Sequence, residues 1–202
     1  MDPSYGHPTD PSTQTGGRDA LRLRRRAALV AFGAVALGIV ASDQLLKGWV
    51  TANFQPNTPS PVLDDWLRID FIHNAGGLFG IFQGSAPLFA LVTIGVVAIL
   101  VALEVGSGWR NWLVTLTLGL LLGGALGNLI DRIRFGYVVD FADIGIGTWR
   151  FYIFNVADSA VTVAILLILG LWLVAPLVGV HVPGDRNGEE IGTKAAGSEQ
   201  GR

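Results

Sequence analysis

The chain has 202 residues, 50% of them hydrophobic, with a formal net charge of −2, three histidines and no cysteine. The absence of cysteine excludes disulfides, thiolate nucleophiles and cysteine-ligated metal sites, and the histidines are far apart, which disfavours a histidine metal cluster. No basic face with interleaved aromatic residues indicates nucleic-acid binding. The apolar residues lie in runs too long for a soluble core, which predicts an integral membrane protein.

The two ends of the chain differ from its middle in composition. Pro, Ser, Thr and Gly are frequent there and apolar residues are few, so ordering these segments would bury too little surface to offset the lost entropy. We therefore expect residues 1–24 and 181–202 to be disordered cytoplasmic tails. Residues 25–180 are expected to form one membrane domain.

Four apolar segments follow in that domain, each of about 18–24 residues and so able to cross a hydrocarbon core of about 30 Å. Only helices satisfy their own backbone hydrogen bonds in lipid, so the predicted class is an all-α membrane protein. A cleaved signal peptide is the alternative for the first segment, but helix-compatible sequence continues through DQLLKGWV. The segments lie near 26–49, 86–105, 111–130 and 157–178.

Basic residues predict the orientation. Four arginines immediately precede or begin the first segment, which by the positive-inside tendency places both termini in the cytoplasm. Arginines at 132, 134 and 150 then fall in an outer loop and oppose this orientation unless partners hold them. The arginines of the N-terminal group are Arg22, Arg24, Arg25 and Arg26.

Two outer loops carry strand patterns. In WLRIDFIHN, Leu67, Ile69 and Phe71 occupy alternate positions, a period-two signal, and residues 149–154 show a second alternation. The two segments are expected to pair into a small extracytoplasmic β-sheet on the outer membrane surface. Asp143, between them, is interpreted as a loop or turn residue.

Helical rise places several polar residues at one depth. At about 1.5 Å per residue, Asp43, Asn128 and Asp158 reach the outer leaflet boundary from three different segments. Asp131, Arg132 and Asp140 follow at or just above that level, whereas Glu104 belongs at the inner end. Carboxylates at a bilayer edge are costly and are usually kept for function, so Asp140 and Asp158 indicate acid–base chemistry. The alternative for Asp158 is a helix cap.

Five motifs in this layer resemble those of one family. They are DQLLK (43–47), NAGGLFG (74–80), GGALGNLIDR (123–132), GYVVDF (136–141) and FNVADS (154–159). In this order, across four segments covering about residues 25–178, they are similar to lipoprotein signal peptidase, also called signal peptidase II.

The resemblance implies a bacterial inner-membrane aspartyl endopeptidase with its site near the outer leaflet. Such an enzyme removes the signal peptide from a prolipoprotein by hydrolysing the bond before a diacylglyceryl-modified cysteine. Asp140 and Asp158 match its catalytic pair, and two carboxylates sharing a proton supply the base and the acid that hydrolysis needs. The implied partners are prolipoproteins and membrane lipid; no metal or cofactor is expected, and a monomer suffices.

A supporting set surrounds the pair. Asn155 lies three residues before Asp158, and Asp43 and Lys47 have helical ion-pair spacing. Arg132 is expected to pair with Asp131 or Asp43, or to hold a substrate carbonyl. An ion network that braces helix ends and direct substrate contact both remain open for this set. Asn74 and Gly76 are expected to shape a loop over the site, with Asn74 able to donate to the substrate backbone. The full set is Asp43, Lys47, Asn74, Gly76, Asn128, Asp131, Arg132 and Asn155.

Gly119, Gly123 and Gly127 recur every four residues, which indicates close helix packing first and room for a lipid-bearing peptide second. Two other classes of function compete with peptidase activity. A proton-coupled exporter would need an acid near mid-membrane, which the apolar segment centres disfavour. A non-catalytic assembly factor would use the glycine face and would tolerate Asp140→Asn and Asp158→Asn.

Overall fold

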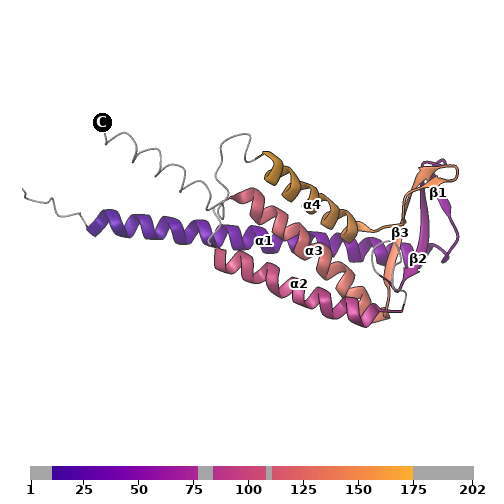
Figure 1. Ribbon diagram of the computed structural model, residues 1–202, viewed down its shortest axis with the longest axis horizontal. Helices are drawn as coiled ribbons and strands as arrows, with labels where there is room; N and C mark the ends of the chain where they lie inside the picture. The colour runs from indigo at the N-terminus through magenta and orange to yellow at the C-terminus, as the bar shows by residue number, and fades with distance from the viewer. Residues whose placement is uncertain (1–10, 77–83, 108–110, 175–202) are drawn as a thin grey trace, which may run out of the picture. The chain divides into compact units, whose positions relative to one another are not determined.

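The computed structural model describes residues 11–76, 84–107 and 111–174 (Figure 1). Within these ranges four helices are long and apolar enough to cross a membrane, which confirms the expected fold class. They are α1 (Pro11–Asn53), α2 (Ala86–Ser107), α3 (Trp112–Phe135) and α4 (Val156–Val174). The chain divides into two compact units between Ala164 and Ile165, and every site residue lies in the first.

The first helix is longer than its apolar segment requires. It begins at Pro11 and has 43 residues, so residues 11–24 are helical where a disordered tail was expected. The reason is that extending a nucleated helix fixes one residue for each bond gained, and the Leu, Arg and Ala residues that precede the apolar run are good helix formers. Residues 1–10 and the expected tail at 181–202 lie outside the described residues.

Small residues bring α1 and α3 into close contact. A Cβ atom added to Gly119 would lie 3.0 Å from the Phe32 carbonyl oxygen, and one added to Gly123 would lie 2.8 Å from that of Ala36. Real Cβ atoms essentially never come closer than 3.0 Å, so the backbones could not approach this closely with larger residues. The packing interpretation of the glycine face is therefore confirmed.

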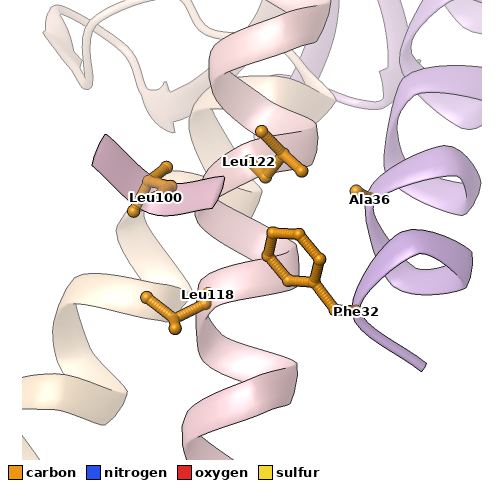
Figure 2. Close-up of a cluster of buried hydrophobic side chains, with 5 residues drawn as sticks. All are labelled: Phe32, Ala36, Leu100, Leu118 and Leu122. Atoms are coloured by element: carbon orange, nitrogen blue, oxygen red, sulfur yellow. The ribbon is translucent and has the colours of Figure 1, made fainter. Parts of the chain in front are cut away.

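A buried apolar cluster joins the first three helices. Figure 2 shows the Phe32 ring reaching from α1 toward the α3 side chains, with a leucine of α2 on their other side. The many dispersion contacts among these side chains hold the three helices side by side. The cluster consists of Phe32, Ala36, Leu100, Leu118 and Leu122.

Helix α3 is capped at both ends. Asn111 accepts a hydrogen bond from the Leu113 N–H at 3.0 Å and begins the helix. Gly136 ends it at φ 77°, a left-handed conformation that favours glycine, and its N–H donates to the Arg132 carbonyl. The next strand begins two residues after this cap, at Val138.

The two outer loops form one antiparallel sheet, as expected, but its pairing differs. The order is β1 (Ser60–Leu63), β2 (Leu67–Asn74), β3 (Val138–Ile146) and β4 (Trp149–Arg150). The main partner of β2 is β3, not the segment 149–154, of which only two residues form β4. Strand β3 was not predicted because its first three residues are all buried, which removes a clear inside–outside alternation.

The sheet is attached to the end of α1 by a second apolar cluster. Val50 of α1 packs with Phe71 of β2 and Val139 of β3, and all three side chains are at most 5% exposed. Successive strand residues point to opposite faces, so Asp140 lies on the face away from Val139. This attachment fixes the height of β3 above the helices.

Candidate active site

Asp140 and Asp158 come from different elements, the start of β3 and the first turn of α4. Asp140 is 2% exposed and Asp158 is partly buried. In the described residues their side-chain hydrogen bonds come from asparagine amides and one backbone N–H rather than from cations. The direct hydrogen-bond partners of both carboxylates are therefore neutral.

The register of the sheet places the partners of Asp140. Asp140 pairs with Ile72, so Asn74 is its diagonal neighbour on the same face. The Asn74 side-chain amide donates to Asp140 Oδ2 at 2.9 Å, and that of Asn155 donates to Oδ1 at 2.7 Å. Both carboxylate oxygens are thus held by amide donors.

Asp158 combines a capping role with a contact toward the site. Asn155 Oδ1 accepts from the Asp158 N–H at 2.8 Å, and Asp158 Oδ2 accepts from the Asn155 N–H at 3.4 Å, which is a capping box at the start of α4. The other oxygen, Oδ1, accepts from the Asn128 amide at 2.8 Å. Asp158 therefore caps the helix through Oδ2, as the alternative interpretation expected, while its Oδ1 faces Asn128 in the site.

Asn155 connects the two carboxylates. Its amide nitrogen donates both to Asp140 and to Asn128 Oδ1, the latter at 3.1 Å, while its oxygen caps the helix that carries Asp158. Asn155 is 1% exposed, so its rotamer is fixed by these bonds and by packing. One neutral side chain therefore sets the relative position of both acids.

The environment changes the acidity of Asp140. Burial, followed by the nearby charge of Asp158, raises its pKa from the ordinary 3.8 to about 7, although the amides of Asn74 and Asn155 and the charge of Lys47 act in the opposite direction. Near neutral pH this carboxyl group can therefore both hold and release a proton.

A cavity gives access to this group. It has a volume of about 520 Å³, and Asp140 and Asn74 line it together with Arg68, Asp143 and Tyr152. The space lies along β2, β3 and the segment that follows β4.

Lys47 lies at the centre of a buried ion cluster below the pair. Its ammonium group is 2.8 Å from Asp43 Oδ2, 2.8 Å from Asp131 Oδ2 and 3.1 Å from Asn128 Oδ1. Three acceptors match the three N–H donors of a lysine. Asp43, Lys47 and Asp131 are at most 3% exposed, so the ammonium charge is compensated within the protein by the two carboxylates.

The two carboxylates of this cluster hold the backbone beside the acids. Asp43 Oδ1 accepts from the Ala157 N–H at 3.0 Å, and Asp131 Oδ2 accepts from the Val139 N–H at 3.1 Å. Ala157 and Val139 are the residues immediately before Asp158 and Asp140. Of the two roles left open for these residues, this geometry supports an ion network that braces the site.

Gln44 belongs to the same cluster and was missed by sequence reasoning. Its side-chain amide donates to Asp131 Oδ1 at 2.9 Å and to the Gly127 carbonyl at 3.2 Å. Its position inside the DQLLK motif is the only signal for it, because a glutamine on a helix flank is normally a solvated residue.

Arg132 forms no ion pair with Asp43 or Asp131, the two acids expected as its partners, because both bind Lys47. Its guanidinium instead donates to the Gly76 carbonyl at 3.3 Å and lies over the Phe89 ring, 5.5 Å from the centroid. Gly76 also donates its N–H to Asn74 Oδ1 at 3.0 Å. Arg132 and Asn74 thus hold the start of the NAGGLFG segment, of which residues 77–80 lie outside the described residues.

Asp143 lies on strand β3, not in a loop or turn as expected. It is 2% exposed and forms ion pairs with Arg68 and Arg150, both at 2.9 Å. Burial raises the pKa of Asp143, but hydrogen bonds from the two arginines outweigh it and hold the pKa below its ordinary value. The pKa of Asp143 is thus shifted in the opposite direction to that of Asp140. Asp143 also binds Arg150, one of the outer-loop arginines that opposed the predicted membrane orientation.

The model of the family described as Signal peptidase (SPase) II matches residues 35–174 of this chain. The lipoprotein signal peptidase of Moorella thermoacetica is 42% identical over 134 residues, which cover 66% of this chain and 87% of that protein. That of Halothermothrix orenii is 43% identical over 142 residues, covering 68% and 92%.

Solved structures agree with the sequence comparison. A structure titled as a bacterial membrane enzyme at 2.3 Å resolution superposes with a TM-score of 0.67 at 33% identity, covering 71% of this chain and 87% of its own. A second, at 1.9 Å resolution, gives 0.63 at 34% identity, covering 69% and 90%. With the family match over residues 35–174, these findings show that the chain belongs to the signal peptidase II family.

Proposed function

We propose that this protein removes signal peptides from prolipoproteins by hydrolysing the peptide bond before the diacylglyceryl-modified cysteine, with Asp140 and Asp158 as its catalytic pair. The names of its relatives support the substrate class. The observation that carries the catalytic assignment is that one amide, Asn155, contacts Asp140 and caps the helix bearing Asp158, with no cation bound to either acid in the described residues.

The pair works with one shared proton. The ionised carboxylate takes a proton from water as the water oxygen bonds to the scissile carbonyl carbon, and the protonated carboxyl donates its proton to the carbonyl oxygen. Return of a proton to the leaving nitrogen then breaks the carbon–nitrogen bond and frees the amine of the cysteine. A pKa of Asp140 near 7 supports this division, because like charges this close do not both ionise cheaply. The two acids titrate as a unit.

The other residues support this chemistry by position. Asp43, Lys47 and Asp131 hold the backbone before each acid, and Asn128 and Asn74 orient the carboxylates. Arg132 and Gly76 shape the adjoining loop. Preorganisation of this kind lowers the barrier because no reorientation is needed when charge moves.

The test is cleavage of a diacylglyceryl prolipoprotein by purified variants in detergent. Asp140→Asn and Asp158→Asn each keep the side-chain shape but cannot share a proton, so cleavage falls by about 10²–10⁴-fold, the usual contribution of acid–base groups. Asp143→Asn is the matched control, since it changes another buried acid of the same strand, and it retains cleavage well above either variant.

Two outcomes overturn the proposal. A single Asp140 or Asp158 variant that cleaves at near wild-type rate, while folded, removes that residue from the mechanism. Loss of wild-type cleavage on adding a chelator requires a metal ion in the reaction, and that arm is therefore run in the same assay.

We also propose that both termini are cytoplasmic and that the acids face the outer leaflet. The chain has no cysteine, so single cysteines report orientation without background. Trp149→Cys, at a site 88% exposed, reacts with an impermeant maleimide in intact cells, whereas Leu23→Cys, at a site 65% exposed, reacts only after permeabilisation. The reverse pattern contradicts this orientation.

A further inference from the structure

A second cavity lies at the opposite end of the helices from the two acids. Its volume is about 580 Å³, and α1, α2 and α3 all contribute to its walls. Figure 1 shows α1 continuing past the ends of α2 and α3 where this cavity lies. Alanines of α1 and Leu116 make the walls mainly apolar, and among the described residues the charged groups that line the cavity are Arg24, Arg25 and Glu104.

Glu104 carries an unused acceptor at this cavity. The side chain is 6% exposed, and its Oε1 accepts from the Thr115 hydroxyl at 3.3 Å. Oε2 is buried and has no hydrogen-bond partner among the described residues. An unsatisfied buried carboxylate oxygen is costly, so this atom needs a donor beyond the described residues, and a cation is the preferred one.

The two arginines supply the opposite chemistry. Arg25 donates one N–H to the Val105 carbonyl at 2.9 Å, which holds its guanidinium beside the end of α2. A guanidinium group has five N–H donors, so others remain for a ligand. Neither Arg24 nor Arg25 forms an ion pair with a described carboxylate. Guanidinium groups of this kind are the preferred donors to phosphate.

The depth of the cavity is that of lipid headgroups. From Ala86 to Glu104, α2 rises about 27 Å, close to the thickness of a hydrocarbon core. Trp112, also at the cavity, is 71% exposed at the start of α3, as interfacial tryptophans are. The cavity thus opens where phosphates and headgroup amines are found, with apolar walls toward the acyl chains.

We propose that this cavity binds phosphatidylethanolamine from the leaflet opposite the active site, with its phosphate on Arg24 and Arg25 and its ammonium group donating to Glu104 Oε2. Charge complementarity selects this occupant, since two cations face the phosphate and one carboxylate faces the ammonium. Phosphatidylcholine offers the same charges without an N–H donor, and phosphatidylglycerol offers a hydroxyl donor without a cation. The site does not depend on the proposed catalysis.

The test is native mass spectrometry of the full chain with a headgroup series that keeps charge and loses donors: phosphatidylethanolamine, its N-methyl and N,N-dimethyl forms, and phosphatidylcholine. Affinity falls along the series, by about tenfold or more overall, because a charge-assisted hydrogen bond is lost. Equal affinity for the first and last members overturns the proposal, and so does tighter binding of phosphatidylglycerol.

Variants locate the site. Glu104→Gln reduces the preference for phosphatidylethanolamine over phosphatidylcholine to about twofold or less, because an amide oxygen accepts a weaker hydrogen bond from the ammonium N–H than a carboxylate does. The double variant Arg24→Gln, Arg25→Gln weakens both lipids equally. The matched control is Arg22→Gln, Arg26→Gln, which removes two charges from the same helix away from the cavity and leaves binding unchanged. If the control weakens binding as much as the Arg24 and Arg25 variant, a general attraction to lipid replaces the site.

Discussion

Two pairs of carboxylates lie beside each other in this protein, and their partners differ. Asp43 and Asp131 flank the ammonium group of Lys47, each at 2.8 Å. Asp140 and Asp158 are joined through the neutral amides of Asn155 and Asn128. Asp43, Asp131 and Asp140 are all buried, so burial alone does not make an acid reactive; the partner decides whether its proton is available.

The first pair also serves the second. Each of its carboxylates binds the backbone N–H immediately before one of the other two acids, at Ala157 and Val139. The ion cluster therefore positions the acids without neutralising them by direct contact. This division suggests where substitutions change stability and where they change the chemistry.

Removing the lysine has the largest expected effect on stability. Lys47→Met leaves two buried carboxylates without their cation, which lowers the free energy of unfolding by about 3–5 kcal/mol. The triple variant Lys47→Met, Asp43→Asn, Asp131→Asn removes all three charges and keeps acceptors for the two backbone N–H groups. It is therefore more stable than Lys47→Met in thermal unfolding in detergent; a triple variant that is less stable contradicts the comparison.

The next largest loss of stability is expected from a side chain that crowds the ion cluster. A Cβ atom added to Gly127 would lie 2.8 Å from Asp43 Oδ2 and 3.1 Å from the Ala157 Cβ, so Gly127→Ala costs about 1–3 kcal/mol of unfolding free energy. Gly38→Ala is the matched control, because nothing lies within 4 Å of its added Cβ, and alanine favours the helix there. Equal melting temperatures for the two variants contradict the tight packing.

The pair held by neutral amides responds to pH. In the proposed mechanism, loss of the shared proton removes the acid, so kcat/KM falls about tenfold per pH unit above the titration of the pair. With the pKa of Asp140 at about 7, the decline begins near neutrality. A rate profile that stays flat to pH 9 excludes a shared proton with this pKa.

The same pKa has a consequence for stability. Folding raises the pKa of Asp140 from 3.8 to about 7, so the folded protein retains a proton that the unfolded chain releases. The contribution of Asp140 is favourable below pH 3.8 relative to its value above pH 7, and it is lost as the pH rises through that window. Asp140→Asn removes this dependence, and unfolding measured at several pH values detects the change.

The smallest effect separates the two roles of Asn155. Asn155→Ala removes the cap of α4 and costs about 1 kcal/mol of unfolding free energy. Asn155→Ser restores a capping oxygen but not the amide that donates to Asp140, so its stability recovers while its cleavage rate stays low. A serine variant with full activity shows that the amide contact is dispensable.

The sequence predicted the spanning helices and strand β2 because each is a periodic or continuous apolar pattern of sufficient length. It did not predict strand β3, although GYVVDF was recognised as a motif, because burial on both faces hides the alternation. Nor did it predict the helical start at Pro11, since polar composition says little about a segment that continues an existing helix.

Among the site residues, sequence spacing found the pair Asp43 and Lys47. Of the two roles it left open for Arg132, pairing with Asp131 or Asp43 is not the one observed, because Lys47 binds both acids. Contacts between residues about 90 positions apart, such as Gln44 with Asp131, have no periodic signature. Helical rise alone, however, placed Asn128 and Asp158 at one depth, and their side chains are 2.8 Å apart.

The sequence by itself determined that four helices are long and apolar enough to cross a membrane, and that acids at the ends of three of them lie at one depth. Hydrophobic length and helical rise are local properties, which is why the sequence suffices. Tertiary structure alone decided which acids meet a cation and which meet an amide. That choice depends on the register of β3 against β2 and on the glycine contact between α1 and α3. It gives Asp140 and Asp158 a different chemistry from Asp43 and Asp131.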